Sequence, residues 1–157
     1  MQLLFKQRLF SWFDSYDIYH EDGSTAFSVK SRMDWGHRLE ISDHTGCPVA
    51  TLREKVLSFL PRFDMIIGDN FIGSIKKKLT LFKPVFTLDC NGWEVRGDIW
   101  EWNYEVDAPS GTQIMRAAKE IFNWTDTYII QIADPQNALL SLMIVLAIDA
   151  AKCSKND

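Results

Sequence analysis

An apolar segment near the C-terminus, residues 134–154, constrains the fold of this chain more than any other feature. Asp134 is a good helix N-cap, and Pro135 suits the first helical position because no backbone N–H is needed there. Across residues 138–148 the only polar side chain is Ser141, so large apolar side chains point in every direction around a helical period. A helix that is apolar all round is buried all round or lies in a membrane.

The length of this segment separates the two possibilities. A membrane-spanning helix needs about 20 apolar residues. Residues 138–151 supply 14, and Asp149 interrupts that run. We therefore expect a central helix over 134–154 that is buried in protein, and no transmembrane segment. A C-terminal membrane anchor is the alternative, and this length disfavours it.

The preceding residues, 1–133, contain an internal repeat. Each unit has a large aromatic residue, a bulky residue four positions later and an aliphatic residue two positions after that. Even offsets place all three side chains on one face of a β-strand. The six units are Trp12, Tyr16 and Ile18; Trp35, Leu39 and Ile41; Phe59, Phe63 and Met65; Phe82, Phe86 and Leu88; Trp100, Tyr104 and Val106; and Trp124, Tyr128 and Ile130.

Turn-forming residues follow each of the first five units, and a second β-prone run follows each turn. The turns lie at 21–24, 43–46, 68–70, 91–92 and 108–111, and the second runs at 26–30, 49–53, 71–76, 93–96 and 113–117. The opening residues, 3–9, can supply one further strand. The sequence thus predicts about 12 strands in hairpin-like units, followed by one helix.

Hairpin strands with regular turns indicate a sandwich or a barrel. A closed antiparallel barrel has no open edges, and 12 strands enclose an interior too wide for their own side chains to fill. A helix that is apolar on all sides would fill it. We therefore predict a mostly β fold of one domain, residues 1–157: a closed 12-stranded antiparallel barrel (1–133) around a buried hydrophobic helix (134–154).

Four segments carry a family resemblance: QRLFSWFDSYDIY, LSFLPRFDMII, NGWEVRGDIWEWNYEV and NWTDTYIIQIADPQNALLSLMIVLAIDA. They resemble the LURP-one-related family of the tubby C-terminal-like superfamily, to which phospholipid scramblases are distantly related. The resemblance covers nearly the whole chain and implies the same 12-stranded barrel around a hydrophobic C-terminal helix. Tubby domains bind phosphoinositides through basic residues, so it also implies a binding module. The scramblases' acidic calcium-binding segment has no counterpart here.

Composition narrows the function classes. The net charge of −4 argues against a general nucleic-acid binder, which would carry a basic surplus. The three cysteines, Cys47, Cys90 and Cys153, are odd in number and lack C-x-x-C spacing, which disfavours a disulfide framework or a zinc site. Charged residues break the apolar run at the N-terminus, so we expect no signal peptide and a cytoplasmic protein, free or peripheral to a membrane. No cofactor is expected.

The densest positive cluster is Lys76-Lys77-Lys78 with Lys83. On a strand Lys76 and Lys78 share one face, whereas Lys77 shares the face of Ile75 and must reach the barrel mouth if that face points inward. The candidate site for an anionic ligand consists of Lys76, Lys78, Lys83, Arg53 and Lys55. The alternative is a solvated outer face that lysines keep soluble.

Other chemistry-bearing residues give weaker signals. The three histidines lack metal-ligand spacing, and His37 shares the parity of Leu39, so it is expected to face the core. Trp93, Trp100 and Trp102 suit a core or a stacking platform. Carboxylates at 14, 98, 101, 105 and 126 suit turn or bulge roles better than paired acid–base catalysis. Nucleophile-elbow, metalloprotease and phosphate-loop motifs are absent, so we assign no catalytic or metal-binding residue.

These observations lead to a non-enzymatic binding module that holds an anionic phospholipid surface or a protein partner. Two alternatives stay open. One is a small enzyme that acts on a lipid or an apolar metabolite at the barrel mouth. The other is a regulatory scaffold protein.

Overall fold

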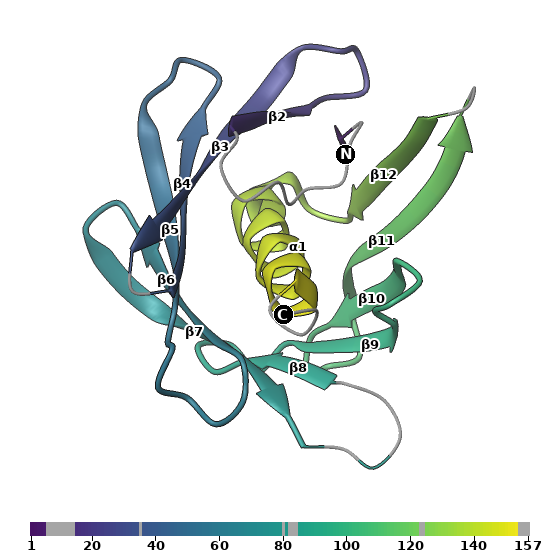
Figure 1. Cartoon of the computed structure of the whole chain (residues 1–157). Coiled ribbons are helices and arrows are strands. Elements are labelled where there is room, and N and C mark those ends of the chain that lie inside the picture. The colour runs from purple at the N-terminus through teal and green to yellow at the C-terminus, as the bar shows by residue number, and fades with distance from the viewer. Residues whose placement is uncertain (6–14, 35, 80, 82–84, 123–124, 154–157) are drawn as a thin grey trace.

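The computed structural model of the chain describes residues 1–5, 15–34, 36–79, 81, 85–122 and 125–153. Within these residues, twelve antiparallel strands form a closed barrel and one α-helix runs through its middle (Figure 1). This architecture confirms the fold expected from the sequence.

The strands follow one another around the barrel in chain order, and β1 closes the ring by pairing with β12. Each strand therefore lies beside its neighbours in sequence. The strands are β1 (Gln2–Phe5), β2 (Ser15–Tyr19), β3 (Thr25–Asp34), β4 (Gly36–Asp43), β5 (Pro48–Glu54), β6 (Arg62–Ile67), β7 (Asn70–Lys78), β8 (Val85–Leu88), β9 (Glu94–Asp98), β10 (Asn103–Asp107), β11 (Gln113–Phe122) and β12 (Thr125–Ile132).

The repeat places its second and third members on the inner face of the barrel. Eleven of these side chains are buried, and Tyr16 is partly buried against them. The buried members are Ile18, Leu39, Ile41, Phe63, Met65, Phe86, Leu88, Tyr104, Val106, Tyr128 and Ile130. The even spacing therefore predicted the inward parity correctly.

The first member of the repeat behaves differently. Phe59 is 93% exposed and Trp100 is 46% exposed, since each lies in a loop ahead of its strand. The expectation that both share the inward face is wrong. Trp12, Trp35, Phe82 and Trp124 lie outside the described residues.

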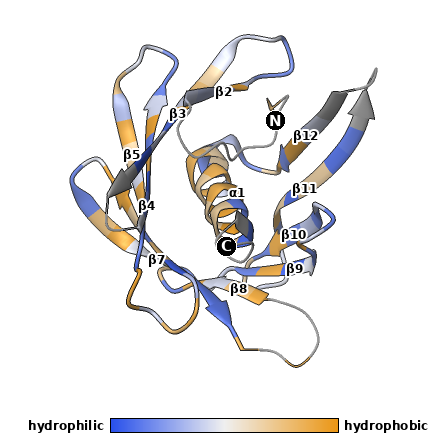
Figure 2. Ribbon diagram, in the orientation of Figure 1, coloured by the Kyte–Doolittle hydropathy of each residue, from blue (hydrophilic) through white to orange (hydrophobic). Residues whose placement is uncertain are grey.

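The central helix, α1 (Ala138–Cys153), follows a short 3₁₀ turn, Pro135–Asn137. The Asp134 carboxylate accepts a 2.9 Å hydrogen bond from the backbone N–H of Gln136, as expected of an N-cap. Residues 141–151 are all buried, and Figure 2 shows α1 as the largely hydrophobic centre of the ring. The structure thus confirms the buried central helix, although its first turn is 3₁₀ and Ser154 lies outside the described residues.

The helices of the described part of the chain are all too short or too polar to cross a membrane.

The alternation of strand direction gives the barrel two distinct ends. α1 begins at the end that carries the β2–β3, β4–β5, β6–β7, β8–β9 and β10–β11 turns, which we call the entry end. It finishes at the opposite, exit end, which carries the β5–β6, β7–β8 and β9–β10 loops. The Lys152 ammonium in the last helical turn donates a 3.4 Å hydrogen bond to the backbone oxygen of Trp100 in the β9–β10 loop.

Candidate functional site

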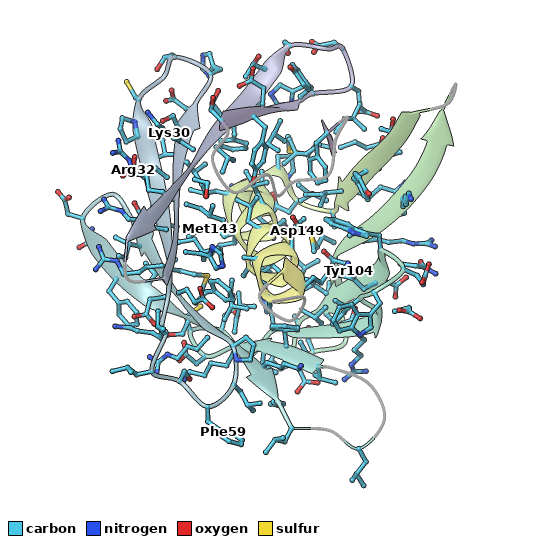
Figure 3. All side chains as sticks on the ribbon, viewed as in Figure 1. Lys30, Arg32, Phe59, Tyr104, Met143 and Asp149 are labelled. Carbon is cyan, nitrogen blue, oxygen red and sulfur yellow. The ribbon has the colours of Figure 1, made fainter. Side chains whose placement is uncertain are left out.

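Basic side chains gather on the outer face of β3 to β7, near the exit end of the barrel. Each lies within two residues of the exit-end terminus of a strand, so neighbouring hairpins carry their basic residues at a similar height on the barrel. Figure 3 shows two cations of this outer face, Lys30 and Arg32, pointing away from α1. We call the cluster the basic collar; it consists of Arg32, Arg38, Arg53, Lys55, Arg62, Lys76 and Lys78.

The strand register sets these cations side by side. Arg38 lies directly opposite Arg32 on one neighbouring strand and opposite Arg53 on the other. Arg62 lies opposite Lys76. Like charges directly opposite one another in a sheet destabilise it. The collar therefore costs stability that its carboxylate partners must offset, as is common at binding surfaces.

Four carboxylates pair with the collar, and two of them serve two of its cations each. Glu40 lies 3.0 Å from Arg32 Nε and 3.1 Å from Arg38 Nη2. Asp64 lies 3.1 Å from Lys55 Nζ and 3.3 Å from Arg62 Nε.

Each of the other two carboxylates pairs with one cation of the collar. Asp89 lies 2.7 Å from Lys76 Nζ, and Glu94 lies 3.1 Å from Lys78 Nζ. Arg53 is exposed and has no ion-pair partner among the described residues. The collar thus has seven cations and four ion-paired carboxylates, a surplus of three positive charges within this set, in a chain of net charge −4.

Asp64 anchors the middle of the collar. Its Oδ1 accepts a 2.8 Å hydrogen bond from Ser74 Oγ, and Arg62 Nη2 donates to the same hydroxyl at 3.1 Å. Burial raises the pKa of the Asp64 carboxyl, but the hydrogen bonds from Ser74 and Lys55 and the nearby positive charges outweigh it, so this pKa lies below its ordinary value. Asp64 is therefore ionised at neutral pH and holds Lys55 and Arg62 in place.

Asp89, which directly follows β8, holds Lys76 in a similar way. Its Oδ1 accepts a 2.6 Å hydrogen bond from the backbone N–H of Ser74, and its Oδ2 faces Lys76. Partial burial raises the pKa of Asp89, but the hydrogen bonds from Lys76 and Ser74 outweigh this effect, so the pKa lies below its ordinary value. Hydrogen bonds from Lys78 and Arg96 likewise hold the pKa of Glu94 below its ordinary value.

The structure brings together four of the five residues expected at an anionic site: Arg53, Lys55, Lys76 and Lys78. Lys83 lies outside the described residues. Sequence reasoning missed three members of the collar, Arg32, Arg38 and Arg62. All three lie on outward-facing strand positions at the exit end of neighbouring hairpins. This shared position can be recognised only when the strand register is known.

Lys77 lies on the inner face, between the buried Ile75 and the barrel mouth. It lines a cavity of about 10 Å³ together with Phe86, Trp100, Ile148 and Lys152. This position is the one expected for a lysine whose strand face points inward, since its long stem can carry the ammonium toward the mouth.

The other candidates take structural positions. His37 is buried on the inner face, where its Nε2 lies 3.6 Å from Glu54 Oε2, as its parity predicted. Trp102 is buried among aromatic rings, whereas Asp98 accepts hydrogen bonds from the backbone N–H groups of Trp100 and Glu101. The side chains at 14 and 126 lie outside the description. Among the described side chains, no three His, Cys, Asp or Glu groups lie close enough to hold a metal ion.

An open hollow of about 310 Å³ lies at the entry end, away from the collar. Its lining mixes polar with apolar side chains and carries both signs of charge, including Glu21 and Arg116. It contains no member of the basic collar.

A closed twelve-stranded barrel threaded by a hydrophobic helix is a distinctive class of fold, and the comparisons with known proteins identify its family. The chain belongs to the LURP-one-related family, whose model matches residues 1–149. It is similar to the uncharacterized protein YxjI of Bacillus subtilis (strain 168), with 29% identity over 158 aligned residues that cover 100% of this chain and 97% of that protein.

A solved structure supports the fold. An X-ray structure of a protein from Arabidopsis thaliana superimposes with a TM-score of 0.60 and 18% sequence identity, covering 92% of this chain and 89% of that one. At this identity the similarity concerns the fold of the barrel.

Proposed function

We propose that this protein is a non-enzymatic binding module that holds anionic lipid headgroups at the basic collar. The observation that carries the proposal is the surplus of positive charge on one outer face of a chain that is acidic as a whole. A net-negative protein approaches an anionic surface productively only through such a face.

The collar side chains are exposed enough to reach a headgroup. The side chains of Lys55 and Lys78 are 51% and 53% exposed, and that of Arg32 is 52% exposed. Ion pairs at such exposure are worth roughly 0–1 kcal/mol, so a phosphate can replace the carboxylate partner at small cost. Each cation near an anionic membrane contributes about 1 kcal/mol, and arginine can engage a phosphate through two hydrogen bonds.

The exit-end mouth of the barrel favours binding on its outside over chemistry on an enclosed substrate. The mouth at the exit end holds a cavity of about 10 Å³, which is close to the space for one water molecule. An apolar metabolite would need some 300–1,000 Å³. At the exit end, the outer face is therefore a better candidate for recognition than the mouth.

Vesicle co-sedimentation tests the proposal. Wild-type protein is mixed with neutral phosphatidylcholine vesicles and with vesicles that also contain phosphatidylserine or a phosphoinositide, at low and at physiological salt. We expect binding to the anionic vesicles that weakens as salt rises, because salt screens exposed charges. No sedimentation with any vesicle would exclude the proposed function.

Matched variants locate the site. Arg53→Gln removes the collar cation that has no ion-pair partner in the described part of the chain. Arg116→Gln removes an exposed cation of β11 on the other side of the barrel. Arg53→Gln should weaken anionic binding severalfold, and Lys76→Gln with Lys78→Gln should weaken it further. Equal losses for Arg53→Gln and Arg116→Gln would show that net charge, not the collar, controls binding.

A further inference from the structure

The exit end of the barrel exposes large apolar side chains at three loops. In the β5–β6 loop Leu57 and Phe59 are 103% and 93% exposed, and in the β7–β8 loop Leu81 is 93% exposed. Figure 3 places Phe59 at the outer tip of its loop, and Figure 2 shows the same loop as hydrophobic. We call the set the apolar tips; it consists of Val56, Leu57, Phe59, Leu79, Leu81 and Trp100.

Packing does not account for the most exposed of the apolar tips, Leu57, Phe59 and Leu81. A side chain as exposed as Leu57 makes almost no contact that stabilises the fold, and water contact with it is unfavourable. Scattered apolar residues on a surface are ordinary, but several at one end of a molecule with a polar border indicate an interaction surface. The tips have this arrangement, because all three loops lie at the exit end.

Basic residues border the tips directly. Lys55 precedes Val56, and Lys78 precedes Leu79. Lys152 donates a hydrogen bond to the backbone oxygen of Trp100. The rest of the basic collar lies on the adjoining outer face, within two residues of the same strand ends. In the β5–β6 and β7–β8 loops, apolar tips beside cations match the interface of an anionic bilayer, where acyl chains lie beneath phosphates. The β9–β10 loop, which carries Trp100, also carries the carboxylates Asp98 and Glu101.

We infer that the exit end docks on an anionic bilayer, with the apolar tips inserted at the headgroup–acyl boundary and the basic collar against the headgroups. This inference rests on the proposed function and adds the orientation of the protein and a second, apolar component of binding. It places the entry end and its acidic turns away from the membrane.

Charge and shape favour a bilayer over other occupants. A second copy docked through the same end would bring two basic collars together, and like charges repel. A bilayer accepts separate protruding tips at one depth, whereas a protein partner would need a matching pocket for each loop. The surplus positive charge of the collar complements anionic headgroups.

The first test separates the apolar component from the electrostatic one. Leu57→Ser with Phe59→Ser removes two exposed side chains, so folding is expected to be unchanged. Phe71→Ser is the matched control, because Phe71 is 59% exposed on β7 at the entry end. On phosphatidylcholine–phosphatidylserine vesicles at physiological salt, the tip variant should bind at least about tenfold more weakly than wild type, whereas the control should bind like wild type.

The second test reports the orientation. An environment-sensitive NBD label is attached at position 59 of a Phe59→Cys variant, or at the native Cys47, which is exposed in the entry-end turn, with the other cysteines replaced by serine. Anionic vesicles should shift the emission to the blue at position 59 and leave it unchanged at Cys47. A shift at Cys47 instead would overturn the orientation.

The failures of the two proposals are distinguishable. Vesicle binding that survives the tip substitutions, with an unshifted label at position 59, would refute insertion and leave the collar proposal standing. Loss of self-association in the tip variant, measured by sedimentation velocity, with unchanged vesicle binding would assign the tips to a second copy and overturn the inference. Absence of wild-type binding to every vesicle would overturn both proposals.

Discussion

Ser74 Oγ donates a 2.8 Å hydrogen bond to Asp64 Oδ1 between β7 and β6, and both residues are buried although they lie on the outer face of the barrel. Arg62 and Lys55 lie against this pair and contribute to its burial. The basic collar is thus built on a fixed polar network. A network of this kind is costly to leave half-satisfied, because each buried polar atom then loses its partner.

Replacing Asp64 should therefore destabilise the fold. Asp64→Ala leaves Ser74 and two cations without their acceptor, and we expect the free energy of unfolding to fall by about 1–3 kcal/mol. Urea unfolding followed by circular dichroism measures the change. Glu40→Ala is the control, since Glu40 is a more exposed partner of two collar arginines than Asp64 is of its own, and its removal should cost less than about 1 kcal/mol. Equal losses for the two variants would contradict a buried role for Asp64.

The same carboxylates predict how stability depends on pH. The pKa values of Asp64, Asp89 and Glu94 are lower in the folded protein than their ordinary values. Their contribution is fully present above the unfolded-state pKa values, about 3.8 for Asp and 4.5 for Glu, and is lost as pH falls through the lower folded-state values. The melting temperature should hence be steady from pH 7 to about 5 and fall steeply below about 4. Asp64→Asn should flatten this fall, and an unchanged slope in that variant would exclude Asp64 as its source.

The sequence predicts the burial pattern well because burial is periodic. Ile41, Met65 and Val106 lie on the inner face because even spacing is a property of any strand. The enclosure of α1 by apolar side chains is predicted just as directly from the sequence, since a helix without a polar face has to be enclosed. Phe59 fits the spacing but misleads, because Pro61 stands between it and β6. Proline cannot donate to the strand ladder, so the strand begins after it. Proline was the signal that sequence reasoning missed.

The basic collar was predictable only in part. Lys76 and Lys78 lie two residues apart in a run of three lysines and stand out, whereas Arg32, Arg38 and Arg62 are far apart in the sequence. Their proximity depends on the register of β3 with β4 and of β6 with β7. Register is set by packing of the inner face and by the bulges, which a single sequence does not display.

The close approach of β9 to β10 should make Gly97 hard to replace. A Cβ at Gly97 would lie 2.7 Å from the backbone oxygen of Asn103 and 2.9 Å from Tyr104 Cα, and its φ is +114°. We expect Gly97→Ala to lower the free energy of unfolding by about 2–4 kcal/mol, through strain and displaced backbone.

Gly111→Ala separates these two causes. Gly111 also has a positive φ, +83°, but a Cβ there meets nothing within 4 Å. Its replacement should cost about 1 kcal/mol from backbone strain alone. Thermal unfolding of both variants measures the difference, and equal losses would mean that β9 moves aside to accommodate the Cβ.

A charge placed at Leu142, in the middle of the barrel, should abolish the fold. Leu142 is 0% exposed inside the barrel, so Leu142→Asp would bury a carboxylate with no partner and should cost more than about 4 kcal/mol, a large part of the stability of a typical domain. We expect a protein that is insoluble or lacks a cooperative melting transition. Leu57→Asp introduces the same charge at a fully exposed position, and its melting temperature should match that of wild type. Wild-type stability in Leu142→Asp would place α1 outside the core, whereas a large loss in Leu57→Asp would show that the β5–β6 loop supports the barrel rather than presenting its side chains to a membrane.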